Sequence, residues 1–146
     1  MFYFMLNYDD EKYWIECDDD NYAVRQVFFD EHGNYHISCM EDCLIEGVFC
    51  QSESEGEVTY IRKDEFEEVW QNELKKYERQ WNIIKENYRI GDNVKGICKY
   101  FYPQGAIIYG ENFRAVYKET IKHVINQEIS GTICGYDEVN MWLVII

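Results

Sequence analysis

The stretch NVKGICKYFYPQGAIIYGENFRAVY, residues 93–117, contains the alternation of strand and turn on which the fold prediction depends. Its apolar segments are separated first by Pro103-Gln104-Gly105 and then by Gly110-Glu111-Asn112. Because proline and glycine interrupt strands and favour turns, this order predicts three strands joined by two short turns. We expect the strands at residues 93–100, 106–109 and 113–117.

Two further strands are predicted after this stretch, at residues 129–135 and 141–146. The residues between them, 136–140, include aspartate and asparagine, which are common in turns. A helical turn is expected near residues 119–124. Five short strands and one helical turn predict an all-β, five-stranded OB-type barrel over residues 90–146.

Three segments of this region resemble a known family. They are IGDNVKG at 90–96, GAII at 105–108, and GTICGYD at 131–137, the last followed by Trp142-Leu143-Val144. They are similar to the opening, the second strand and the closing hairpin of the S-one-type OB domain. That domain is repeated in a large ribosomal protein and occurs in several ribonucleases. The resemblance covers residues 90–146 only, and the N-terminal part resembles no family.

The resemblance implies single-stranded nucleic-acid binding as one hypothesis. RNA-binding members stack bases on exposed aromatic residues of the second and third strands, beside basic residues. Gln104 and Ile107 stand where the family often has phenylalanine, so two stacking platforms are absent. The candidate residues that remain are Lys99, Tyr100, Tyr102, Phe113, Arg114 and Lys118.

Residues 1–89 are predicted to form a separate, acidic α+β domain. Short strands are expected at 2–8, 13–16 and 22–29, each bounded by aspartate or asparagine. A turn at 30–34 then leads into a strand at 35–39, as in a β-hairpin.

A long amphipathic helix, about residues 64–88, is predicted to end this domain. Asp64 precedes Glu67 by three residues, a spacing typical of a helix start. The apolar residues that follow recur every three or four positions, which predicts one stripe. They are Phe66, Trp70, Leu74, Tyr77, Trp81, Ile84 and Tyr88. We expect the stripe to pack inside the protein, and the alternative is a docking face for a partner. The domain boundary is placed after residue 89.

The acidity of the chain is concentrated in its first part. The net charge is −14, and residues 1–90 hold 22 acidic and 9 basic residues. Such a surface repels phosphate backbones and attracts basic proteins, although it can also be merely solvated. We therefore predict a non-catalytic binding protein with a basic protein partner, similar in size and charge to the antidotes that neutralise basic toxins. The expected contact residues are Asp18, Asp19, Asp20, Glu65, Glu67 and Glu68.

No catalytic, metal or cofactor site is predicted. His32, His36, Cys39, Cys43 and Cys50 lie close together in the sequence, but their spacing differs from that of structural zinc sites. The same residues lack a recognisable oxyanion-hole segment and a third orienting group for nucleophilic catalysis. Glycine-rich phosphate loops and hydrolase motifs do not occur in the sequence.

A cytoplasmic location is expected. The first ten residues lack the positive flank and the cleavage site of a signal peptide. No apolar run reaches the roughly 20 residues needed to cross a bilayer. The six cysteines are therefore expected to be reduced thiols.

Overall fold

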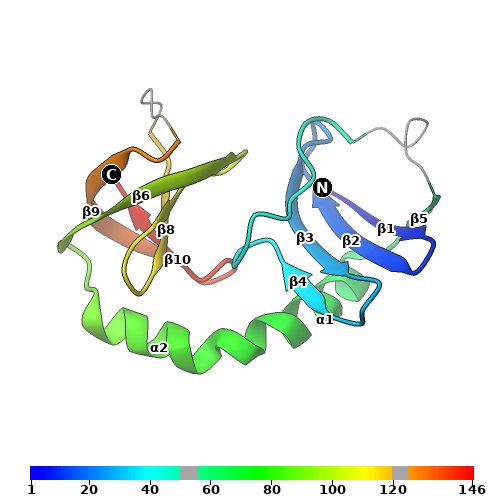
Figure 1. Ribbon diagram of the computed structural model, residues 1–146, viewed down its shortest axis with the longest axis horizontal. Coiled ribbons are helices and arrows are strands. Elements are labelled where there is room, and N and C mark those ends of the chain that lie inside the picture. The colour runs from blue at the N-terminus through cyan, green and yellow to red at the C-terminus, as the bar shows by residue number, and fades with distance from the viewer. Residues whose placement is uncertain (50–55, 120–124) are drawn as a thin grey trace. The chain divides into compact units, whose positions relative to one another are not determined.

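The chain forms two compact units in the computed structural model shown in Figure 1. The units are Met1–Tyr77 and Glu78–Ile146, so they divide twelve residues before the boundary placed after residue 89. The structure describes residues 1–49, 56–119 and 125–146. The helical turn expected near 119–124 lies almost wholly outside these residues. No helix among the described residues is long and apolar enough to span a membrane.

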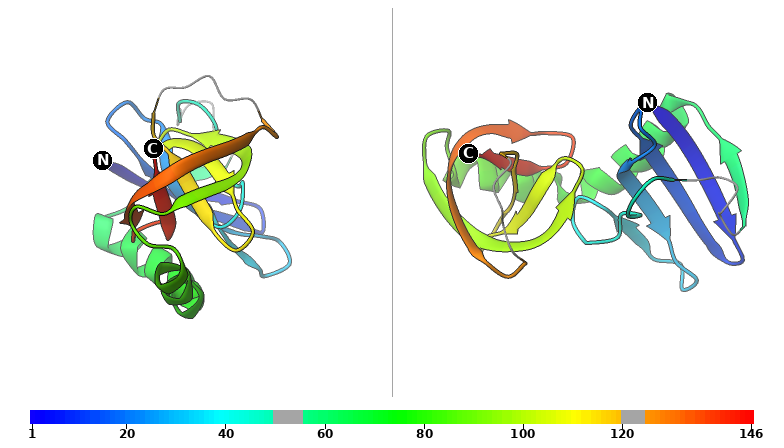
Figure 2. Two further views of the ribbon diagram at one scale, coloured as in Figure 1. Left: turned by 90° about the vertical axis from the view of Figure 1, so that its left-hand side faces the viewer. Right: turned by 90° about the horizontal axis from the view of Figure 1, so that it is seen from above.

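A five-stranded antiparallel sheet forms the N-terminal unit, with the strand order β4-β3-β2-β1-β5. Figure 2 shows these strands side by side. Their bounds are β1 Phe2–Tyr8, β2 Glu11–Cys17, β3 Ala23–Phe29, β4 Tyr35–Ile37 and β5 Glu57–Tyr60.

Each face of this sheet is covered by a different segment. Tyr3 pairs with Glu16, and Glu16 with Arg25, so these residues share the face on which α1 (Lys63–Leu74) packs. The Tyr3 ring lies 5.5 Å from that of Phe66 in α1. On the opposite face, the Gln26 side chain bonds backbone groups of residues 43 and 45. The segment before residue 50 therefore covers that face.

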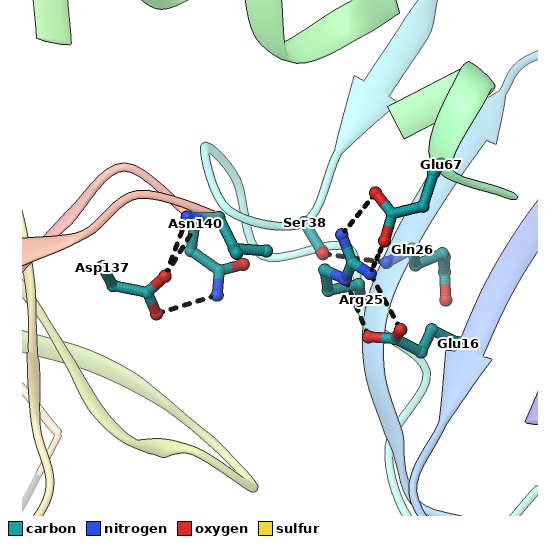
Figure 3. A network of polar contacts seen from close by, with 8 residues as sticks. Glu16, Arg25, Gln26, Ser38, Glu67, Asp137 and Asn140 are labelled. Carbon is teal, nitrogen blue, oxygen red and sulfur yellow. Dashed lines mark hydrogen bonds and ion pairs between the residues drawn. The ribbon is translucent and has the colours of Figure 1, made fainter. Parts of the chain in front are cut away.

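A buried ion pair joins two strands to α1. Arg25 donates from Nε and Nη2 to the two carboxylate oxygens of Glu16, at 2.7 and 2.8 Å, and it also bonds Glu67 (Figure 3). Its guanidinium carbon lies 4.9 and 5.0 Å from the ring centroids of Phe66 and Trp70. Arg25 and Glu16 are each only 5% exposed. The network thus fixes α1 on the sheet.

The C-terminal unit contains α2 and a second sheet. The order of the strands is β10-β8-β7-β6-β9, and β9 also pairs with β10. Their bounds are α2 Glu78–Asn87, β6 Asn93–Tyr102, β7 Gly105–Tyr109, β8 Arg114–Tyr117, β9 Glu128–Asp137 and β10 Trp142–Ile145.

The turn between β9 and β10 holds α2 in place. Asp137 accepts bonds from the backbone of Val139 and Asn140 and from the Asn140 amide, which orders the turn (Figure 3). The neighbouring Glu138 accepts from Trp81 Nε1 at 2.7 Å and from Lys85 Nζ at 3.0 Å. One face of α2 is thereby fixed to this turn.

The predicted fold class, an α+β domain with a long helix followed by a five-stranded OB-type barrel, was wrong. The described residues are mostly β, in two sheets, and their 25 helical residues are not one long helix. The pairings of the C-terminal strands complete a ring, but β8 and β10 share only three residue pairs. Both β6–β7 and β9–β10 shift register. With ladders this short and shifted, the ring is not a clear example of the five-stranded OB-type barrel predicted.

The predicted helix 64–88 is interrupted in its middle. After α1 the chain forms the 3₁₀ turn η2, Lys75–Tyr77, and α2 begins only at Glu78. Its start also differs, because Arg62 is the N-cap and the Arg62 backbone N–H donates to Glu65, at 3.3 Å. Glu67, which was expected to complete the cap, instead turns towards Arg25. A local spacing rule cannot detect this competing buried cation.

The substitution Arg25→Gln is expected to destabilise the N-terminal unit by about 3–5 kcal/mol, because it leaves the Glu16 carboxylate buried without a cation. The measurement is a urea titration followed by the NMR amide signals of β2 and β3. Arg62→Gln is the matched control, since its ion pairs with Asp64 and Glu65 are exposed. Such pairs contribute less than about 1 kcal/mol. Equal losses for both variants would contradict the role given to Arg25.

Candidate partner-binding site

The turn between β2 and β3 presents the predicted acidic residues Asp18, Asp19 and Asp20, here called the acidic turn. Asp18 Oδ1 accepts from the backbone N–H groups of Asp20 and Tyr22, at 2.9 and 3.0 Å. Asp18 therefore shapes the turn. Asp19 and Asp20 are exposed, and Asp19 accepts a bond from the amine of Met1 at 2.8 Å.

An aromatic pocket opens next to the acidic turn. Its volume is about 190 Å³, and it is lined by Phe2, Phe4, Asn21, Phe49 and Tyr60. The Phe4 ring packs 4.9 Å from that of Phe49 and 4.7 Å from that of Tyr60. Phe2 and Tyr60 are 45% and 62% exposed. The pocket thus combines a packed aromatic floor with exposed rings.

Asn21 connects the pocket to the acidic turn. It follows Asp20 directly, and its carbonyl oxygen accepts from the Phe49 N–H at 2.8 Å. A bridge between Tyr22 and Val48 holds the same segments together. An apolar side chain seated in the pocket would therefore lie beside exposed carboxylates. This arrangement suits an apolar residue flanked by lysine or arginine.

The whole net charge of the protein lies in the unit that contains this pocket. Residues 1–77 hold 20 acidic and 6 basic residues, whereas residues 78–146 hold 8 of each. One of the six basic residues, Arg25, is buried and forms ion pairs with Glu16 and Glu67. It therefore does not neutralise the exposed carboxylates. The N-terminal unit therefore has a net charge of −14.

The acidic residues predicted on the helix divide into two kinds. Glu65 and Glu68 are exposed on α1. Glu67 is half-buried, and its hydrogen bond from Arg25 lowers the pKa of its carboxyl. It is therefore engaged in an ion pair inside the unit. Among the described residues, no hydrogen bond or ion pair joins this group to the acidic turn.

The residues predicted for nucleic-acid binding do not form an exposed stacking surface. Tyr100, Tyr102 and Phe113 are buried, and their rings pack against other rings, the first two at 4.9 Å from each other. These three rings pack against other rings inside the unit and are not exposed for base stacking. Lys99 and Lys118 are exposed, and Arg114 is half-buried. The exposed ring of β6 is Phe101, on the opposite side of the strand from its two neighbours.

The histidines and cysteines of the N-terminal unit are tied to other groups. His36 contacts Asp30 through Nε2 and Glu41 through Nδ1, both at 2.8 Å. Burial, followed by the charge of Glu41, raises the pKa of the Cys43 thiol to about 12, which opposes thiolate formation. Cys39 is buried and His32 is exposed, while Cys50 lies outside the described residues. Among the residues described, no group of three or more could hold a metal ion.

Neither a scan against protein-family models nor a search of the curated proteins found a match for this chain. The resemblance to the S-one-type OB domain therefore stays a prediction.

The aromatic part of the pocket could not be predicted from the sequence. Its rings come from β1, β5 and the segment before residue 50, which meet only through the strand register. The one local signal was the sequence DDDNY at 18–22, in which acidic turn residues pass directly into an aromatic strand start. Register between distant strands cannot be read from such a signal.

The contacts of His36 predict a pH-dependent contribution to stability. The hydrogen bond to Asp30, followed by that to Glu41, raises the pKa of His36, and the same bond lowers the pKa of Asp30 to about 2. A raised histidine pKa stabilises the fold below the unfolded value of about 6.5, and this contribution disappears as pH rises through the folded pKa. A lowered carboxyl pKa stabilises it above about 4, and this is lost as pH falls towards about 2.

In the variant His36→Gln, the loss of melting temperature relative to the unmodified protein is expected to be largest between about pH 4 and 6.5 and to shrink at higher pH. Thermal unfolding followed by circular dichroism at several pH values measures it. His32→Gln, at an exposed position of the same hairpin, is the control and should lower the melting temperature less than His36→Gln does. A loss for His36→Gln that grows with rising pH would contradict the assignment.

Proposed function

We propose that this protein is a non-catalytic binding protein whose acidic N-terminal unit engages a basic protein partner. The observation that carries the proposal is the aromatic pocket whose lining includes Asn21, the residue next to Asp20, in the unit that holds the entire net charge of −14. Interfaces of this kind draw most of their affinity from a few aromatic anchors in pockets. The surrounding charges mainly accelerate association and select the partner.

An antidote to a basic toxin is the functional class that we propose for the chain. Such a partner carries the lysine and arginine residues that the acidic turn would attract. An apolar residue among those cations would enter the pocket formed by Phe2, Phe49 and Tyr60. Binding alone is sufficient for this activity when it covers the functional surface of the partner, so it needs no catalytic group.

The charge of the acidic turn is expected to set the association rate. The probe is a fluorescein-labelled peptide, Lys-Arg-Leu-Arg-Lys, mixed with the full chain in a stopped-flow anisotropy experiment. The double variant Asp19→Lys, Asp20→Lys should slow association several-fold at low salt, and the difference should diminish as salt screens the charges.

The double variant Asp10→Lys, Glu31→Lys is the matched control. It changes the net charge equally, but at the opposite end of the sheet, in the β1–β2 and β3–β4 turns. It is expected to slow association less. The same slowing in both variants would show that overall charge, and not the acidic turn, determines the rate, and an unchanged rate in both would reject the proposal.

The dissociation rate of the peptide separates the contribution of the pocket from that of the charges. Tyr60→Ala removes an exposed pocket wall and should increase the dissociation rate of the leucine peptide while leaving its association rate nearly unchanged. The peptide Lys-Arg-Ser-Arg-Lys is the control, and it should dissociate equally fast from both forms of the protein. If Tyr60→Ala leaves the dissociation of the leucine peptide unchanged, the pocket is not an anchor.

A labelled oligothymidine, titrated at two salt concentrations, examines the competing nucleic-acid hypothesis. We expect no binding, because Tyr100, Tyr102 and Phe113 are buried and the C-terminal unit has no net charge. Affinity that falls steeply as salt rises would instead assign the function to the C-terminal unit.

A further inference from the structure

A cleft in the C-terminal unit lies between α2 and the β7–β8 turn. Its volume is about 610 Å³, and all its lining residues belong to this unit. Gln80, Ile83, Ile84 and Asn87 form its helical wall, at spacings that place them on one face of α2. This face is distinct from that of Trp81 and Lys85, which bind Glu138. The bonds to Glu138 therefore hold α2 in place through residues that do not line the cleft.

The opposite wall is formed by the β7–β8 turn and its ends. Gly110 donates its N–H to the Phe113 carbonyl at 2.9 Å, and a Cβ atom on Gly110 would lie 2.2 Å from Cζ of Phe113. Only glycine therefore allows the Phe113 ring to pack against the turn. That ring meets Tyr88 edge-on at 4.8 Å, and the Tyr88 carbonyl accepts from the Tyr136 hydroxyl at 2.7 Å. These contacts give the cleft a fixed aromatic end.

Arg114 is the cationic residue of this wall. It lies opposite Tyr109 in the β7–β8 ladder, and its guanidinium carbon is 4.6 Å from the Tyr109 ring centroid. Its Nε–H is buried and lacks a hydrogen-bond partner, and none of the ion pairs found among the described residues includes it. Arg114 lines the cleft and is only half-buried, so its guanidinium is a partly desolvated charge that remains accessible from the cleft. Such an environment favours an anionic acceptor.

We propose that this cleft binds a small organic anion. Its carboxylate or phosphate group would accept two parallel bonds from the Arg114 guanidinium, which has the planar geometry that both groups match. Its apolar body would rest on Ile84, Tyr88 and Phe113. The side-chain amides of Asn87 and Asn112 line the same cleft and supply further donors. Glu111, the one acidic residue of the lining, is exposed at the tip of the turn.

The proposal is tested by NMR on the full-length protein labelled with ¹⁵N, in which arginine Nε–H groups give their own signals. The probes are benzoate and phenyl phosphate, which share a ring and differ in the anionic group, and benzamide, the neutral counterpart of benzoate. We expect both anions to move the Arg114 Nε–H signal and the Asn87 and Asn112 amide signals, with saturation by about 10 mM, as millimolar affinity implies. The stronger of the two identifies a carboxylate or a phosphate as the natural group.

Two variants assign the effect to Arg114. Arg114→Gln should weaken binding at least tenfold, and Arg114→Lys should weaken it several-fold, because lysine keeps the charge but loses the Nε–H and the planar fork. Arg114→Lys keeps the proposal testable if the glutamine variant fails to fold. Lys95→Gln, an exposed site on β6 outside the cleft, is the control and should bind as the unmodified protein does.

Several results would overturn the proposal. These are an unmoved Arg114 signal with both anions, equal shifts at the exposed Arg79 and Arg89, and equal binding by benzamide. If inorganic phosphate binds as tightly as phenyl phosphate, the cleft does not recognise an apolar body, and that part of the proposal is wrong. All these outcomes concern the C-terminal unit, so they are independent of whether the N-terminal unit binds a basic partner.

Discussion

The ion pair of Arg25 with Glu16 and Glu67 is the constraint on which the N-terminal unit depends. A buried arginine needs a planar carboxylate partner, and here two carboxylates meet it from β2 and from α1. The rings of Phe66 and Trp70 enclose the guanidinium, so the charge cannot move to solvent without separating α1 from the sheet. Side chains alternate along a strand, so the register that places Tyr3 of β1 on the α1 face places Phe2 and Phe4 on the other face, in the aromatic pocket.

The two units differ in net charge. The N-terminal unit carries the entire net charge, and mutual repulsion of its carboxylates opposes its own stability. A basic partner would relieve that repulsion, which gives the acidic surface a physical role beyond solubility. The C-terminal unit has no net charge, and its one half-buried, unpaired arginine lies in a cleft. The two proposed sites therefore differ in charge: the N-terminal one is acidic and suits a basic partner, and the C-terminal one contains Arg114 and suits an anion.

Local patterns in the sequence predicted the strands well and the fold class poorly. The strand at 2–8 was predicted with the bounds observed for β1, and the hairpin through Asp30–Asn34 was also found. The apolar stripe of residues 66–88 could not show that helix α1 ends at Leu74, because the 3₁₀ turn keeps similar spacing. Glu67 and Tyr100 illustrate what local patterns cannot show. Their partners, Arg25 and Tyr109, come from other strands or elements, and such pairings depend on register.

A basic partner is proposed to bind at the acidic turn and its aromatic pocket. The most direct measurement is an NMR titration of the ¹⁵N-labelled full chain with the unlabelled peptide Lys-Arg-Leu-Arg-Lys. We expect little change around Asp10 and Glu31 and the largest amide shifts at Asp19, Asp20, Asn21 and Tyr60. Shifts distributed evenly over all exposed carboxylates, or centred on the β1–β2 turn, would contradict this proposal.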